Sequence, residues 1–176
     1  MGSGYIVQRG GGKDYSTFKT CVDRSITEVT AEMLDGVTEI GNYAFYYCSA
    51  LTSVIIPSSV TLIGNSAFSH CTSLASATIQ NGVTSIGETV FHTCSALTSI
   101  TIPSSVTSIG QSTFYGCSSL ASVTVEATTP PTLETNVFNG TSENLVIYVP
   151  AGSVDAYKAA TNWSTYASRI QAIPST

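Results

Sequence analysis

Cysteine is the residue in this chain whose type and spacing could most readily do chemistry. Four of the five cysteines recur at one constant spacing, at Cys48, Cys71, Cys94 and Cys117. Thiolates bind zinc, but structural zinc sites usually take their ligands from Cys-x₂₋₄-Cys pairs, and the sequence contains no such pair. The regular spacing therefore argues against a zinc site and for a structural column.

Disulfide bonds between neighbouring copies are a second reading of the cysteine column. If the copies stack like strands in a sheet, successive Cα atoms lie about 4.8 Å apart, within disulfide range. Parallel side chains would keep their Cβ atoms at about the same separation, beyond the favoured ~3.8 Å. We therefore expect buried, reduced thiols that pack as small hydrophobic groups, with disulfides as the alternative. Cys21 lies outside the column and is expected in an N-terminal cap.

Histidine is the next candidate for metal binding or proton transfer. His70 and His92 lie in neighbouring copies but follow the regularly spaced phenylalanine by two residues and by one, so we do not expect a histidine ladder. No acidic residue or cysteine is placed to complete a metal or catalytic set. A Gly-x-Ser-x-Gly elbow is absent, and "RGGGKD" (9–14) lacks the spacing of a phosphate-binding loop. The sequence predicts no enzymatic activity, no metal site and no cofactor.

The cysteines belong to a repeat that covers most of the chain. Isoleucine-glycine pairs, phenylalanines, leucines and valines all recur with the same period as the cysteines. A period in the twenties is typical of a solenoid, in which each coil buries its apolar residues against the neighbouring coils. The columns are Ile40-Gly41, Ile63-Gly64, Ile86-Gly87 and Ile109-Gly110; Phe45, Phe68, Phe91 and Phe114; Leu51, Leu74, Leu97 and Leu120; and Val37, Val60, Val83 and Val106.

Each repeat mixes two periodicities. Segments such as "LTSVIIP" (51–57) alternate apolar and polar residues, which predicts one short strand per coil in a parallel sheet. A second extended piece, "VTSIG" (83–87), ends in glycine. The phenylalanine, cysteine and leucine then stand three residues apart, which predicts a tight helical or 3₁₀ turn. We therefore expect an α/β solenoid with one parallel sheet and short helical turns on the other side.

These motifs resemble the BspA-like leucine-rich repeats, whose units read roughly L-x-x-I-x-I-P-x-x-V-x-x-I-G-x-x-A-F-x-x-C. The stretch "LTSVIIPSSVTLIGNSAFSHC" (51–71) matches nearly every position. The resemblance implies a leucine-rich-repeat fold. It also implies a non-enzymatic protein of the bacterial cell surface or secreted fraction, which attaches to a protein or glycan partner.

The two ends depart from the pattern and predict caps. We expect an N-terminal segment with a capping helix over 1–25, repeats over 26–128, and a degenerate last repeat with a helical cap over 129–176. The first repeat matches only with a two-residue insertion, and the last keeps Phe138 but loses Ile-Gly and cysteine. Terminal coils must cover an apolar end. The expected C-terminal cap residues are Val154, Tyr157, Trp163, Tyr166 and Ile170.

The outward positions of the predicted strands are the candidate binding face. If Val54 and Ile56 point inward, their neighbours point outward, and the period of the repeat gives the equivalent positions in later coils. Such serines and threonines could simply solvate the sheet, or they could form a shallow face for a protein or glycan. The candidate residues are Ser53, Ile55, Ser76, Thr78, Ser99, Thr101, Ser122 and Thr124. Tyrosines on the turn side offer a second surface for sugar or protein contact: Tyr43, Tyr46, Tyr47 and Tyr115.

Charge limits the classes of partner. Only Glu88 is charged between Gly41 and Val125, and the net charge of the chain is −5. Nucleic acid and anionic membrane surfaces require clustered Lys and Arg, and no apolar run is long enough for membrane insertion, so neither partner is expected. The N-terminal residues lack the apolar segment of a signal peptide. An alternative function is a component of a phage or surface assembly that associates with copies of itself.

Overall fold

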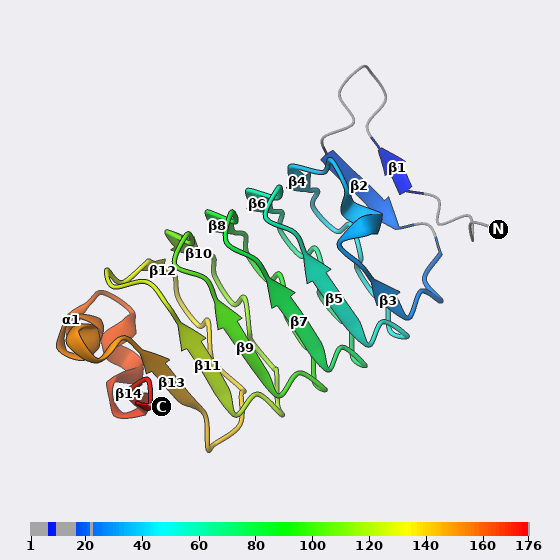
Figure 1. Cartoon of the computed structure of the whole chain (residues 1–176). Helices are drawn as coiled ribbons and strands as arrows, with labels where there is room; N and C mark the ends of the chain where they lie inside the picture. Colours follow the sequence, from blue (N-terminus) through cyan, green and yellow to red (C-terminus); the bar gives the residue numbers. More distant parts are fainter. Residues whose placement is uncertain (1–6, 10–16, 22, 176) are drawn as a thin grey trace.

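The protein is a solenoid of stacked coils with two sheets (Figure 1). The computed structural model describes residues 7–9, 17–21 and 23–175. The sheet of longer strands has the order β14-β13-β11-β9-β7-β5-β3, and all its neighbours are parallel. Its strands are β3 (Glu28–Val29), β5 (Ser53–Ile56), β7 (Ser76–Ile79), β9 (Ser99–Ile102), β11 (Ser122–Val125), β13 (Val146–Val149) and β14 (Ile170–Ala172).

The second sheet is formed by the piece that ends in Ile-Gly. The sequence predicted this piece as extended but predicted only one sheet, whereas the pieces of successive coils pair in parallel. The strand that each of these coils contributes is two residues long, with its isoleucine or leucine buried, whereas the first two strands of the sheet are longer. The strands of the sheet are β1 (Val7–Arg9), β2 (Thr17–Cys21), β4 (Glu39–Ile40), β6 (Leu62–Ile63), β8 (Ser85–Ile86), β10 (Ser108–Ile109) and β12 (Thr132–Leu133).

The segment around each phenylalanine is a run of single turns. As the spacing predicted, Cys71 N–H donates to the carbonyl of Phe68 at 3.2 Å and Leu74 N–H to that of Cys71 at 3.0 Å. Alternate N–H groups instead donate to the next coil, as His70 does to the His92 carbonyl at 2.8 Å. Because these bonds interrupt the local ones, the segment is not a continuous 3₁₀ helix, and the turns form a third ladder along the solenoid.

Phenylalanine forms the centre of the core. Phe68 and Phe91 stack with ring centroids 5.6 Å apart, and Phe91 and Phe114 do so at 5.6 Å. The column continues to Phe45 at one end and to Phe138 at the other, and its rings are nearly parallel. All five rings are buried within one continuous hydrophobic cluster. Each coil therefore depends on its neighbours for burial, as a solenoid requires.

Glycine in the Ile-Gly pairs allows adjacent coils to approach closely. A Cβ at Gly110 would lie 2.5 Å from the carbonyl carbon of Gly87 and 2.6 Å from the nitrogen of Glu88. These are backbone atoms and cannot rotate away. The recurrence of this glycine is thus explained by packing rather than by chemistry.

The C-terminal cap is helical, as predicted. It comprises η2 (Ala151–Ser153), α1 (Val154–Ala159) and η3 (Trp163–Arg169). Trp163 lies 6.2 Å from Phe138 between ring centroids and its indole N–H donates to the Pro131 carbonyl at 2.8 Å. The hydroxyl of Tyr157 donates to the Ala127 carbonyl at 2.7 Å. The cap therefore covers the last ring of the phenylalanine column and bonds to the last coil.

The predicted N-terminal capping helix is wrong for the residues described. Residues 17–21 form strand β2, which pairs in parallel with β4 and antiparallel with β1. Residues 1–6, 10–16 and 22 of the predicted cap lie outside the described part of the chain, and residues 23–25 are described but are not helical. The open edge of the second sheet has unpaired backbone groups that a strand can bond and a helix cannot. Phe18 pairs with Ile40, so β2 occupies the place of a preceding coil.

The first full coil contains the two-residue insertion that the sequence indicated. Val29 pairs with Val54 across a longer stretch of chain than the regular period, whereas Ile40 pairs with Ile63 at the regular spacing. The 3₁₀ turn η1 (Glu32–Leu34) lies between the two strands of this coil. No helix in the described residues is long and apolar enough to cross a membrane.

Candidate functional site

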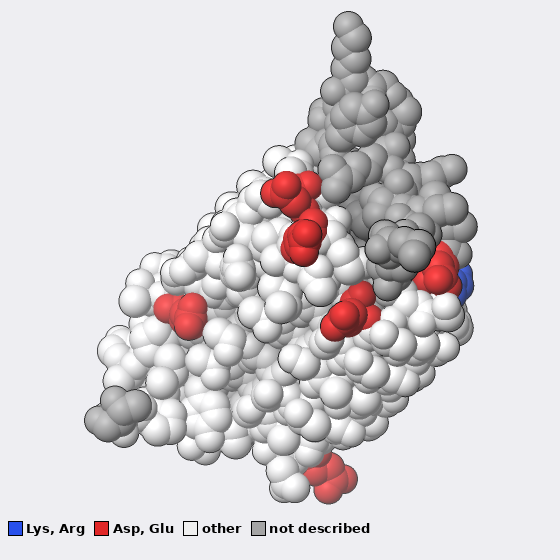
Figure 2. Space-filling view, turned by 45° about the vertical axis from the view of Figure 1, so that its right-hand side comes forward, with Lys and Arg blue, Asp and Glu red and all other residues white. Residues whose placement is uncertain are grey.

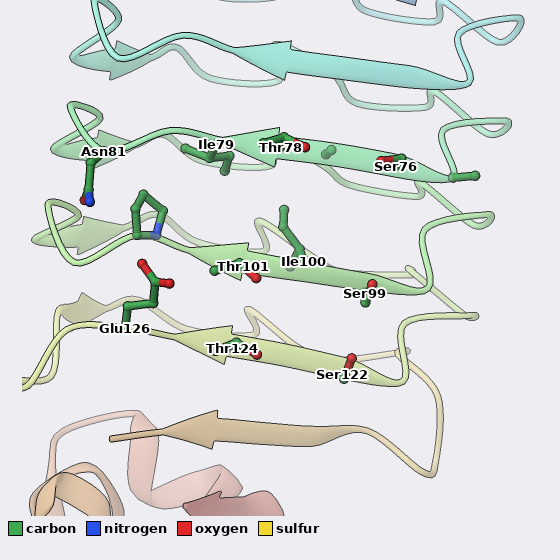
Figure 3. Close-up of a pocket in the computed structure, with 13 residues that line it drawn as sticks. Ser76, Thr78, Ile79, Asn81, Ser99, Ile100, Thr101, Ser122, Thr124 and Glu126 are labelled. Carbon is green, nitrogen blue, oxygen red and sulfur yellow. The ribbon is translucent and has the colours of Figure 1, made fainter. Parts of the chain in front are cut away.

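The candidate binding residues lie on one face of the longer-stranded sheet. Backbone pairing places Thr78 beside Thr101 and Thr101 beside Thr124, and it aligns Ser99 with Ser122. Figure 3 shows the threonines in one column and the serines in another, across β7, β9 and β11. We call this set, which consists of Ser76, Thr78, Ser99, Thr101, Ser122 and Thr124, the hydroxyl face. Its serines and threonines are exposed or half-buried, whereas the residues between them are buried.

The hydroxyl face lines an open depression of about 540 Å³. Asn81 and Glu126 lie at one end of it (Figure 3). Glu126 supplies the one carboxylate among its lining residues. The sequence reading missed Glu126 because it considered only the strands. The signal was present, since Glu126 occupies the position held by Pro57 and Pro103 in earlier coils.

Larger side chains flank the hydroxyl face along the solenoid axis. Ile55 pairs with Thr78 and is 38% exposed, which makes it one of the few exposed large hydrophobic residues of the described chain. At the other end, Tyr148 pairs with Thr124 and is half-buried. Of the eight predicted residues, Ser53 and Ile55 are on the adjacent strand β5 but do not line the depression. The face thus runs from an isoleucine to a tyrosine, with small hydroxyl groups between them.

The surface around the coils carries little charge. Glu88 and Glu126 are the charged residues between Gly41 and Leu133. On the side drawn in Figure 2, the visible acidic residues are scattered and broad areas between them carry no charge. Contacts on the hydroxyl face would therefore depend on hydrogen bonds and packing rather than on ion pairs.

Aromatic rings form a continuous strip on the turn side. Tyr47 stacks on His70 at 4.4 Å, His70 lies 5.3 Å from His92, and His92 stacks on Tyr115 at 5.2 Å. Tyr46 contacts Tyr47 and His70 edge to face, and Tyr43 contacts Tyr46 in the same way. The expectation that the histidines form no ladder is therefore wrong. The two histidines differ by one residue in their position within the repeat, but their ring centroids still lie 5.3 Å apart.

The strip is accessible but its ring faces are partly covered. Tyr47 is 49% exposed and Tyr115 is 44% exposed. Each of them stacks one face on a histidine, with interplanar angles of 9° and 5° respectively. A sugar that stacks on an aromatic side chain needs an open ring face. One face of each of these rings is already occupied by a histidine, which favours the hydroxyl face as the candidate for a glycan.

The cysteine column is buried and its thiols are unreactive. Cys48, Cys71, Cys94 and Cys117 lie buried in the core as thiols and form no disulfides with one another. The thiol of Cys94 donates to the Phe68 carbonyl at 3.2 Å, and that of Cys117 to the Phe91 carbonyl at 3.0 Å. Burial raises the pKa of Cys117 to about 12 and raises that of Cys94 well above its ordinary value. Thiols held in the neutral form are poor nucleophiles and poor metal ligands.

The described residues contain no group of three or more His, Cys, Asp or Glu side chains that could hold a metal ion. The surface features that remain are the hydroxyl face and the aromatic strip.

Comparison with known families decides the classification. The profile of the BspA type leucine rich repeat region matches residues 14–149 in six copies. The chain belongs to the BspA-type leucine-rich repeat family. The match extends beyond the predicted repeat region, 26–128, at both ends. A comparison with curated proteins gave no match.

Solved structures of bacterial leucine-rich-repeat proteins share the fold. The leucine rich repeat protein of T. pallidum is 30% identical, with a TM-score of 0.73, and the match covers 86% of this chain and 72% of that protein. A leucine rich cell surface protein from Faecalibacterium prausnitzii is 28% identical, with a TM-score of 0.70, over 82% of this chain and 37% of that protein. The pneumococcal vaccine antigen PcpA is 16% identical, with a TM-score of 0.65, over 91% of this chain and 43% of that protein, and shows the fold alone.

Proposed function

We propose that this leucine-rich repeat is a non-enzymatic binding module of a bacterial surface or secreted protein, and that its hydroxyl face contacts a protein or glycan. The observation that carries the proposal is the convergence of six serine and threonine side chains on one depression in an otherwise nearly uncharged surface. The cell-surface description of the F. prausnitzii relative supports the location.

The chemistry of the face favours a polar, uncharged partner. Each hydroxyl can both donate and accept a hydrogen bond, and the side chains repeat about every 4.8 Å along the sheet. Serine and threonine lose little side-chain entropy when they are fixed on a rigid sheet. An extended glycan or peptide that lies across several strands could therefore bond to one or two hydroxyls per coil. Ligands whose binding depends on ion pairs would find only Glu126 in the depression.

A binding screen tests the proposal. The purified chain is presented to mucin glycans, extracellular matrix proteins and bacterial envelopes, and light scattering measures its mass over a range of concentrations. We expect saturable binding to at least one polar ligand by a monomeric chain. Failure to bind any of them, together with a mass that rises with concentration, would contradict the proposal and favour the alternative of a self-associating assembly component.

A further inference from the structure

Glu126 lies where two depressions of the surface meet. It lines the depression on the hydroxyl face and also a second one of about 450 Å³, which extends beyond the strand ends to Pro130 and Pro131. Figure 3 shows its side chain extending from the end of β11 toward the preceding coil. Among the described residues that line the two depressions, no other is charged. A ligand that lies across both would therefore meet one charge, the carboxylate of Glu126.

The fold does not use this carboxylate. Glu126 is exposed and occupies the position in the repeat that Gln80 occupies two coils earlier. The side chain of Gln80 accepts a hydrogen bond from the Ser58 N–H at 3.1 Å and so connects its coil to the preceding one. Within the described part of the chain, the Glu126 carboxylate has no such bond and no ion pair, and only its backbone N–H bonds to the preceding coil, to the Ile102 carbonyl at 3.0 Å. The carboxylate is therefore available to a ligand.

The C-terminal cap fixes one wall of the second depression. The hydroxyl of Ser153 donates to the Thr128 carbonyl at 2.7 Å. The indole N–H of Trp163 donates to the Pro131 carbonyl at 2.8 Å. These bonds explain the course of the loop, but none of them involves Glu126. Because the wall is already fixed, a ligand does not have to order it on binding, which lowers the entropic cost of binding.

We propose that the ligand of the hydroxyl face is a glycan with a free amino group, and that Glu126 binds this group as an ammonium ion. The inference rests on the proposed function, because it assigns the ligand of the same face. A carboxylate forms its strongest hydrogen bonds with charged donors, and no Lys or Arg among the lining residues competes for Glu126. The rest of the face is uncharged, so the glycan is neutral over most of its length and carries its amine at the strand ends.

The pairing of the strands favours a glycan over a peptide. Strands β7, β9 and β11 each have a hydrogen-bonded neighbour on both sides. An extended peptide binds a sheet mainly by adding a strand at an open edge, and the hydroxyl face offers no such edge. The amide groups of a peptide would find only side-chain hydroxyls there. A sugar ring presents hydroxyl groups of its own, which can donate to and accept from the serines and threonines.

Calorimetric titration with a matched pair of sugars tests the proposal. One ligand is an N-acetylglucosamine oligomer, and the other is the same oligomer with one acetyl group removed. A mildly acidic buffer keeps the exposed amine protonated. We expect the amine-bearing oligomer to bind at least tenfold more tightly, and this advantage to shrink as salt is added. Equal affinity for the two oligomers, or binding of neither, would overturn the proposal.

Removal of single charges locates the contact. Glu126→Gln keeps the size of the side chain, and we expect at least a tenfold loss of affinity for the amine-bearing oligomer and parental affinity for the acetylated one. The matched control Glu143→Gln removes an exposed carboxylate outside both depressions and should change neither affinity. Equal losses in the two variants would indicate attraction by the net charge of the chain and would overturn the role of Glu126.

Two further measurements separate this proposal from the proposed function. A neutral peptide with one lysine that binds more tightly than the amine-bearing oligomer would overturn the assignment to a glycan. Thr101→Val removes a central hydroxyl of the face. If no ligand prefers an amine but a ligand from the screen loses affinity in Thr101→Val, the amine proposal fails and the proposed function stands. If Thr101→Val leaves the affinity for every ligand unchanged, both fail.

Discussion

Replacement of Phe91 by alanine tests whether neighbouring coils unfold cooperatively. The ring is completely buried and stacks on Phe68 and Phe114 with centroid distances of 5.6 Å on each side. Truncation of a buried phenylalanine costs about 3–5 kcal/mol. Because each stacked pair contributes about 0.5–1.5 kcal/mol and two pairs are lost, we expect a value in the upper half of that range. Phe91→Leu fills most of the space and should cost about 1–2 kcal/mol.

The assay exploits the position of the one tryptophan. Trp163 lies in the C-terminal cap, and its ring contacts Phe138, which is two coils away from Phe91. Urea unfolding is followed by Trp163 fluorescence and by circular dichroism. If neighbouring coils depend on each other, Phe91→Ala shifts both transitions to lower urea by the same amount. A tryptophan transition that stays at its parental midpoint, while circular dichroism loses amplitude, would refute the continuous stacked core.

Three further results are expected. Gly110→Ala should destabilise the fold by about 1–3 kcal/mol in urea unfolding, because its Cβ would meet backbone atoms of Gly87 and Glu88. The control Gly152→Ala has no atom within 4 Å of its Cβ and should change stability by less than about 0.5 kcal/mol. Equal losses of stability in the two variants would contradict the packing argument. The four column thiols should resist alkylation, read by mass spectrometry, until urea unfolds the chain. Since the pKa of Cys117 is raised from 9.0 to about 12, the folded state holds its proton longer than the unfolded state does, and stability should fall as pH rises above 9; a flat profile from pH 8 to 11 would contradict this.

Much of the fold could be predicted because the period of the sequence is also the period of the structure. The columns of Phe68 and its equivalents are buried because each coil repeats the same environment, so one coil predicts the next. The outward positions Thr78 and Thr101 followed from the simple alternation of a strand. Periodicity also predicted the core placement of Cys94.

The features that the sequence did not predict depend on local or non-periodic geometry. Strand β2 was predicted as part of a helix because no regular repeat is visible at that end, and the open edge of the second sheet decides its structure. The His70–His92 contact was missed because a register argument counts backbone positions and ignores the reach of the side chains. Glu126 was missed because it follows a strand rather than belonging to one.

The most direct test of the binding account compares two variants of equal charge. One changes Thr78, Thr101 and Thr124 to lysine on the hydroxyl face; the other changes Thr61, Thr84 and Thr107, which are exposed and equally spaced but lie next to the second sheet. Calorimetry or surface plasmon resonance measures the affinity of each for the ligand found in the screen. The account predicts at least a tenfold loss in the first variant and parental affinity in the second. Equal affinity in both, or a loss only in the second, would contradict the assignment of the binding face.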